Sequence, residues 1–121
     1  LPSAPEVQAV WAEALANSRI QYFGGWDGGH LISSCMPTII PNLTRACRPF
    51  GVIENVVTQS VYRGQGWGRA LLQHALAHAW QARCYKVMLM TGRKDENTLR
   101  FYEQSGFERH GKQAFVARPP Q

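Results

Sequence analysis

A glycine-rich segment from Arg63 to Arg69 holds the residue types best suited to chemistry in this chain of 121 residues. It follows an apolar run of strand character, residues 52–57, and leads into a stretch with helical periodicity. Backbone N–H groups in the first turn of a helix lack helical partners, and the helix dipole adds partial positive charge there. Glycines let a phosphate approach the backbone, and the two arginines supply cations. The segment therefore predicts a site for a diphosphate group.

Two common diphosphate-binding motifs do not fit this segment. The dinucleotide fingerprint G-x-G-x-x-G fails because its sixth position is Arg69 when read from Gly64 and Leu71 when read from Gly66. The P-loop fails because no glycine here is followed by Lys and then Ser or Thr. What remains is Arg-x-x-Gly-x-Gly, residues 63–68. A plain glycine turn before a helix is the alternative interpretation of so short a match.

A second motif lies further along the chain. Periodicity predicts a helix over residues 67–82 and a short strand over residues 86–91. Asp95 is a suitable N-cap for another helix through Ser105, which Gly106 would end. This helix contains Phe-Tyr-x-x-x-Gly-Phe, residues 101–107.

These two motifs, in this order and separated by one helix and one strand, resemble the hallmarks of the GNAT N-acetyltransferase superfamily. The resemblance covers residues 51–118 well and residues 19–50 loosely. It implies an α/β (α+β) fold: a mixed, mostly antiparallel twisted sheet with a splayed parallel strand pair and helices on both faces. It also implies acetyl-CoA as co-substrate, no metal, and a primary amine as the acceptor of the acetyl group.

The resemblance further implies where acetyl-CoA binds. The coenzyme would lie between the splayed strands, residues 53–58 and 86–91, with its pantetheine arm along the backbone of the first strand. The residues expected to bind it are Val56, Val57, Thr58, Arg63, Gly64, Gln65, Gly66, Trp67, Gly68, Arg69, Asp95 and Thr98. Trp67 would pack either over the coenzyme or against the sheet.

One position departs from the superfamily pattern. An asparagine usually stands seven residues before the tyrosine of the second motif, and here that residue is Asp95. Helical spacing makes Asp95 and Thr98 project with Tyr102, whereas Asn97 points about 140° away from Tyr102. The sequence leaves open whether Asp95 or Asn97 replaces the asparagine, or whether Asp95 only caps the helix.

Tyr102 is the candidate general acid. By resemblance, this tyrosine lies beside the coenzyme sulfur, and a phenol with a pKa near 10 is protonated at neutral pH and can donate to a thiolate. The alternative is a core tyrosine, because Leu99, Tyr102 and Gly106 share one helical stripe.

Glu54 is the candidate base. It is the only acidic residue in an apolar strand, and burial there would raise its pKa toward a useful value. Strand alternation puts Glu54 and Val56 on one face. The alternative is a carboxylate at a strand end that pairs with an arginine.

The front of the chain predicts further elements. Val7, Val10, Trp11, Ala14 and Leu15 form one stripe of a helix over residues 5–17. A strand over residues 20–23 would end at two glycines, and a turn at residues 27–29 would lead into a strand over residues 30–36. Residues 37–41 can continue that strand, with their prolines marking an edge or a bulge. Residues 42–49 should form a polar loop.

The superfamily normally begins with a strand and a helix that precede this first helix, and no such strand is found here. We therefore expect one domain over residues 1–121 without the N-terminal strand and helix. Because the sequence does not begin with methionine, upstream residues missing from it are one explanation. A shorter protein, or a partner that takes over the role, are the others.

Composition narrows the partners and the location. The net charge of +5 favours a polyanionic ligand, but no Lys/Arg-rich block indicates nucleic acid. No apolar run approaches the ~20 residues of a membrane span, and no signal peptide is evident. Three cysteines without CxxC spacing fit a reducing cytoplasm and argue against a zinc site. His74 and His78 have a metal-compatible spacing but lack a third ligand.

Residues 53–57 and 84–87 look most like members near the glucosamine-phosphate N-acetyltransferases. An amino sugar is thus one candidate acceptor, and other small amines, amino acids, antibiotics and peptide or protein amines stay open. A non-catalytic coenzyme A sensor on the same fold is the alternative function. Superfamily members often form homodimers, and the sequence leaves the oligomeric state of this chain open.

Overall fold

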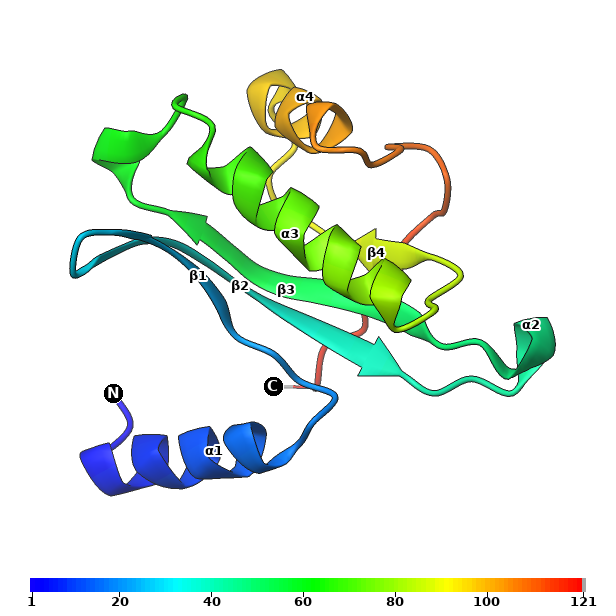
Figure 1. Ribbon diagram of the computed structural model, residues 1–121, viewed down its shortest axis with the longest axis horizontal. Helices are drawn as coiled ribbons and strands as arrows, with labels where there is room; N and C mark the ends of the chain where they lie inside the picture. The colour runs from blue at the N-terminus through cyan, green and yellow to red at the C-terminus, as the bar shows by residue number, and fades with distance from the viewer. Residues whose placement is uncertain (121) are drawn as a thin grey trace.

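A computed structural model describes residues 1–120, which form a four-stranded sheet and the helices around it (Figure 1). In chain order the elements are α1 (Ala4–Ala16), β1 (Phe23–Asp27), β2 (His30–Ile40), α2 (Thr44–Cys47), β3 (Phe50–Thr58), the 3₁₀ turn η1 (Ser60–Tyr62), α3 (Trp67–Gln81), β4 (Val87–Leu89) and α4 (Glu96–Gln104). The predicted helices at residues 5–17, 67–82 and 95–105 are confirmed to within one or two residues.

The sheet has the order β1-β2-β3-β4, with antiparallel pairs up to β3 and a parallel pair between β3 and β4. This confirms the expected mixed, mostly antiparallel sheet. β4 is shorter than the predicted strand at residues 86–91, because it pairs with β3 only from Val87 to Leu89. Beyond Leu89 the two parallel strands separate, as the superfamily fold requires.

A β-bulge marks the point of separation. Met36 pairs with Glu54 and Ser34 pairs with Val57, so β3 holds one residue more than β2 between these pairs. Asn55 in this stretch has φ +56°, in the left-handed region. A bulge of this kind bends its strand and increases the local twist. β3 therefore turns away from β4 just where the parallel pairing stops.

β1 differs from its prediction. The strand expected at residues 20–23 instead begins at Phe23 and runs through both glycines, while Ile20 forms only an isolated bridge. Pro37 explains the late start: it accepts a hydrogen bond from Gln21 N at 2.9 Å but has no N–H to return. β2 continues through Pro37 as an internal strand, so this proline does not mark a sheet edge.

The core lies between the sheet and α3. Leu71, Leu72 and Ala75 on one face of α3 pack with Cys35 of β2 and Ile53 of β3, and Leu72 is 0% exposed. A second cluster (Ile39, Ala79 and Cys84) continues the core toward the end of the helix. α3 is thereby fixed across the sheet with its N-terminus beside the end of β3 (Figure 1).

α1 contacts the other face of the sheet. Ser3 and Glu6 form a capping box at its start, with Ser3 N donating to the Glu6 carboxylate at 2.7 Å. The predicted apolar stripe exists but is not buried, since no residue of α1 is buried. Trp11 contacts Tyr22, with ring centroids 4.6 Å apart. Because Phe23 faces His74 of α3, alternation turns Tyr22 to the opposite face.

The predicted polar loop at residues 42–49 contains α2, a single turn of unexpected hand. Arg45, Ala46 and Cys47 all have φ between 55° and 60°. Asn42 Nδ2 supports this turn by donating to Thr44 O at 3.0 Å and Arg48 O at 3.2 Å. Side chains rarely tolerate consecutive left-handed residues, and the sequence holds no glycine here that would signal them.

Within residues 1–120, none of the helices combines the length and hydropathy that crossing a bilayer would require. The assignment of residues 1–121 to a single domain stays a prediction, as does the cytoplasmic location.

Candidate functional site

An open cavity of about 1070 Å³ lies between the end of β3, the glycine-rich segment, the start of α3 and α4. It brings together every residue that the sequence analysis expected to bind the coenzyme, except Gln65. Gln65 instead donates through Nε2 to Val61 O at 3.3 Å. Three separate stretches of the sequence thus converge on one site, which we call the coenzyme cavity.

The glycine-rich segment has the backbone that an anion site needs. Gly64 and Gly66 have φ values of +76° and +91°, in the region that favours glycine. Gly66 is the N-cap of α3 and offers no capping side chain. The N–H groups of the first turn of α3 are therefore left for a ligand, as in other helix-start anion sites.

Gly66→Ala should weaken acetyl-CoA binding about tenfold, because a side chain at φ +91° strains the loop that presents the N–H groups. Isothermal titration measures the Kd. Gly28→Ala is the matched control, since Gly28 also has a positive φ (+61°) and open space around it but lies in the β1–β2 turn. Equal losses of affinity in both variants would contradict a specific role for Gly66.

Gly68 is required for a different reason, the close approach of α3 and α4. A Cβ atom at Gly68 would lie 2.8 Å from Phe101 Cζ and 3.3 Å from Thr58 Oγ1. Trp67 beside it packs against the sheet, since a Cβ atom at Gly25 would lie 3.2 Å from its ring. Trp67 also lines the coenzyme cavity, so the two placements considered from the sequence do not exclude each other.

Four arginines line the coenzyme cavity, of which the sequence analysis selected Arg63 and Arg69. Arg63 Nε donates to Thr58 O at 3.3 Å, which holds the segment against the end of β3. Arg93 and Arg100 were missed, and their positions on either side of the second helix start were the available signal. All four suit the phosphate groups of a coenzyme.

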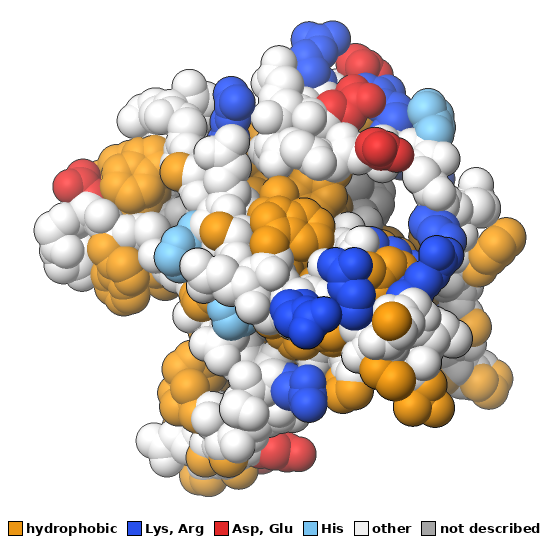
Figure 2. Space-filling model, turned by 45° about the vertical axis from the view of Figure 1, so that its right-hand side comes forward, with side chains coloured by type: hydrophobic (Ala, Val, Ile, Leu, Met, Phe, Trp, Pro, Cys, Tyr) orange, Lys and Arg blue, Asp and Glu red, His pale blue; other side chains and the backbone are white. Residues whose placement is uncertain are grey.

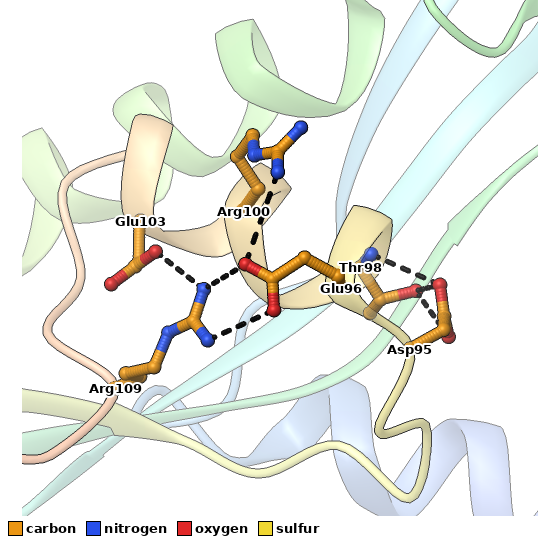
Figure 3. A network of polar contacts seen from close by, with 6 residues as sticks. All are labelled: Asp95, Glu96, Thr98, Arg100, Glu103 and Arg109. Carbon is orange, nitrogen blue, oxygen red and sulfur yellow. Dashed lines mark hydrogen bonds and ion pairs between the residues drawn. The ribbon is translucent and has the colours of Figure 1, made fainter.

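Asp95 caps α4. Its carboxylate accepts hydrogen bonds from Thr98 N at 3.1 Å and from Thr98 Oγ1 at 2.9 Å (Figure 3). These bonds, first that of the Thr98 side chain and then that of its backbone, lower the pKa of Asp95. Asn97 lines the coenzyme cavity as well, although helical spacing had pointed it away from Tyr102.

Arg109 fastens the segment after α4 to both ends of that helix (Figure 3). Its guanidinium donates to both Glu96 oxygens, at 2.9 and 3.2 Å, and to Glu103 at 2.7 Å. The hydrogen bonds from Arg109 lower the pKa of both Glu96 and Glu103. Sequence reasoning missed this residue, because its partners lie 6 and 13 positions away.

Arg109→Gln should make stability less dependent on acid. The pKa values of Glu96 and Glu103 are lowered in the folded state, so their stabilising effect is present above the ordinary value near 4.3 and disappears as the pH falls through the lowered values. Urea unfolding at pH 6 and below pH 4 should show the difference between wild type and variant shrinking in acid. Lys112→Gln, which removes a nearby charge, should show no such convergence.

Tyr102 lies on the wall between two cavities. It lines the coenzyme cavity and also a second cavity of about 730 Å³ beside β4 and the segment after α4. Its ring packs on Phe101 and Phe107, with centroids 5.0 and 6.4 Å away. Burial raises the pKa of Tyr102, which keeps the phenol protonated at neutral pH.

Glu54 is not buried, and on this point the sequence analysis was wrong. The side chain is exposed and lines neither cavity, so the burial on which its candidacy rested is absent. Its position in β3, next to the buried Ile53, directs it to the face away from α3. No ion pair joins it to an arginine within residues 1–120, which disfavours the alternative role.

His74 and His78 both pack edge-on against Phe23, with ring centroids at 4.8 and 5.3 Å. In the described part of the chain, no three His, Cys, Asp or Glu side chains gather as metal ligands would. Cys35, Cys47 and Cys84 are free thiols.

The charged side chains are unevenly distributed. Figure 2 shows Lys and Arg side chains grouped near the middle of one face, and acidic ones mainly at its top among further basic side chains. Four of the 8 acidic residues, Asp95, Glu96, Glu103 and Glu108, lie in or next to α4. Three of these face Arg93 or Arg109, which leaves Arg63 and Arg69 free of acidic partners within the described residues.

Comparisons with known proteins agree with this geometry. The profile described as the acetyltransferase (GNAT) family matches residues 2–107. A glucosamine 6-phosphate N-acetyltransferase of Trypanosoma brucei brucei is 39% identical over 119 residues, which cover 93% of this chain and 79% of that protein.

Two solved structures show the same fold. One, described as an acetyltransferase of Agrobacterium tumefaciens strain C58, has a TM-score of 0.91 and 43% identity over 97% of this chain and 81% of the other. An acetyltransferase of Trypanosoma brucei has a TM-score of 0.77 and 32% identity over 98% and 82%. The chain therefore belongs to the acetyltransferase (GNAT) family.

Proposed function

We propose that this acetyltransferase moves an acetyl group from acetyl-CoA to the primary amine of a small molecule, with an amino-sugar phosphate as the first acceptor to test. The observation that carries the proposal is the coenzyme cavity, which joins an uncapped helix start, four arginines and the Tyr102 phenol. The family uses acetyl-CoA, and the similar trypanosomal protein is named for glucosamine 6-phosphate.

In this proposal the diphosphate of the coenzyme lies on the N–H groups at the start of α3, between Arg63 and Arg69. Gly64 and Gly66 supply the open, left-handed backbone. The edge of β3 from Val56 to Thr58 is released from β4 by the bulge and lines the cavity. An extended pantetheine arm can pair with this free edge as a strand would.

The chemistry exchanges one bond for another. The amine nitrogen bonds to the acetyl carbon, the carbon–sulfur bond breaks, and the amine loses one proton while the thiolate gains one. Tyr102 donates the proton to the leaving sulfur. Its raised pKa keeps that proton in place until a thiolate forms.

Glu54 takes the proton of the amine in this scheme. Since Glu54 lies on the face away from α3 and Tyr102 lies toward α4, the amine would approach from the face opposite to the coenzyme. Glu54 is exposed, so a water molecule can relay the proton.

Titration calorimetry tests the cavity first. Acetyl-CoA and desulfo-coenzyme A should bind with micromolar affinity and NAD should not, after which amine acceptors are tested for acetylation. Binding with no turnover on any amine would favour a coenzyme A sensor. Absence of binding would contradict the proposed cavity.

Glu54→Gln should abolish the acidic limb of the pH profile of kcat/KM, because that limb reports the base in the free enzyme. Coenzyme affinity should not change, since Glu54 does not line the coenzyme cavity. Glu13→Gln, on the exposed α1, is the control. An unchanged acidic limb in Glu54→Gln would remove Glu54 from the mechanism.

A further inference from the structure

A row of side chains crosses the sheet on the face away from α3, outside both cavities. The antiparallel register of β1 and β2 places Tyr22 opposite Met36, and Met36 is paired with Glu54. Adjacent strands lie ~4.8 Å apart, so the backbones of Tyr22 and Glu54 are ~10 Å from each other. This separation accommodates a single sugar ring.

The orientation of the row follows from the core. Cys35 and Ile53 are both 2% exposed and pack beneath α3. Their neighbours Met36 and Glu54 therefore point to the opposite face. Since Glu54 is exposed and Met36 is only half-buried, a ligand can reach this surface.

Hydroxyl groups flank the row. Ser34 and Thr38 stand two positions before and after Met36 in β2, and the alternating burial of this strand puts them on the same face as Met36. Both are half-buried. Their hydroxyls can donate and accept hydrogen bonds, which suits the hydroxyl groups of a sugar.

Two aromatic rings close the row at the β1 end. Trp11 of α1 meets Tyr22 with ring centroids 4.6 Å apart and planes at 57°. Trp11 is 47% exposed and Tyr22 is 42% exposed, so the pair presents ring surface to solvent. Aromatic rings with a polar edge bind ligands that have one apolar face and several hydroxyls.

We propose that Trp11 and Tyr22 form a platform for the sugar ring of the acceptor. The ring lies on the aromatic pair, its hydroxyls reach Ser34 and Thr38, and its amine points along the row to the Glu54 carboxylate. This inference rests on the proposed function and adds the feature that selects an amino sugar over a simple amine. Trp11 and Tyr22 are specificity-determining residues in this arrangement.

The test compares two acceptors that share an amine and a phosphate, glucosamine 6-phosphate and phosphoethanolamine, of which only the first has a ring. Trp11→Ala should raise KM for glucosamine 6-phosphate about tenfold and leave KM for phosphoethanolamine and the Kd of acetyl-CoA unchanged. Trp11→Phe should restore most of the loss. Trp80→Ala, which removes an exposed tryptophan of α3 (51% exposed), is the matched control.

A binding experiment separates this inference from the proposed function. Calorimetry with glucosamine 6-phosphate is run on wild type and Trp11→Ala, each with desulfo-coenzyme A bound. Binding that is lost in Trp11→Ala supports the platform even if no acetylation is found. Equal binding or equal KM in both proteins, or no binding of glucosamine 6-phosphate to the wild type, overturns it. Circular dichroism verifies that the variant is folded.

Discussion

Replacing Tyr102 by phenylalanine is expected to lower kcat by about 10²- to 10⁴-fold, the range for loss of one positioned acid. Phenylalanine keeps the contacts with Phe101 and Phe107 and removes only the hydroxyl. The Kd of acetyl-CoA should hold within about twofold, because the diphosphate site at the start of α3 is untouched. Steady-state kinetics and calorimetry on the same preparation measure both quantities.

Tyr85→Phe is the control for this experiment. Tyr85 also packs against a phenylalanine, Phe50 at 6.4 Å, but it does not line the coenzyme cavity. The loss in Tyr102→Phe should be smaller with acetyl donors whose leaving group is more acidic, because such groups need less protonation. A kcat equal to that of wild type would show that Tyr102 is a packing residue only.

Leu72→Ala is expected to cost about 2–5 kcal/mol of the free energy of unfolding, the range for a large-to-small change in a core. Leu72 is 0% exposed and packs where α3 crosses β2 and β3, so little can move in to fill the space. Urea unfolding at neutral pH measures the loss. A cost of this size takes a large part of the stability of a domain of this length.

Leu76→Ala on the same helix is the comparison for Leu72→Ala. Leu76 is only half-buried and lines the smaller cavity, so its truncation should cost clearly less. Equal losses for the two variants would mean that the core does not lie between α3 and the sheet.

The helices and the site were largely predictable because their signals are local. Asp95 and Gly106 mark the ends of α4 by capping chemistry, and the glycines at 64 and 66 mark a left-handed loop before α3. These signals depend on neighbouring residues alone, so one sequence suffices to detect them. The mixed sheet, in contrast, came from the resemblance and not from strand patterns.

The misjudged features depend on contacts that are distant in sequence. The burial of Glu54 was inferred from its apolar neighbours, but no helix covers that face of β3. The late start of β1 follows from Pro37 on the adjacent strand, and Arg109 meets Glu96 only after α4 is in place. Left-handed residues at Arg45 and Ala46 carry no signal, because neither is glycine.

The short parallel pairing of β4 has a consequence for local opening. β4 is joined to β3 by three residue pairs only, from Gly51–Val87 to Ile53–Leu89, and α4 follows directly from it. Short ladders open at a lower free energy than long ones, so the amides of β4 and α4 should exchange with deuterium well before those of β2. A ligand held between Val56 and Tyr102 bridges the two parts and should slow that exchange. The coenzyme would thus contribute to the cohesion of the fold as well as to its chemistry.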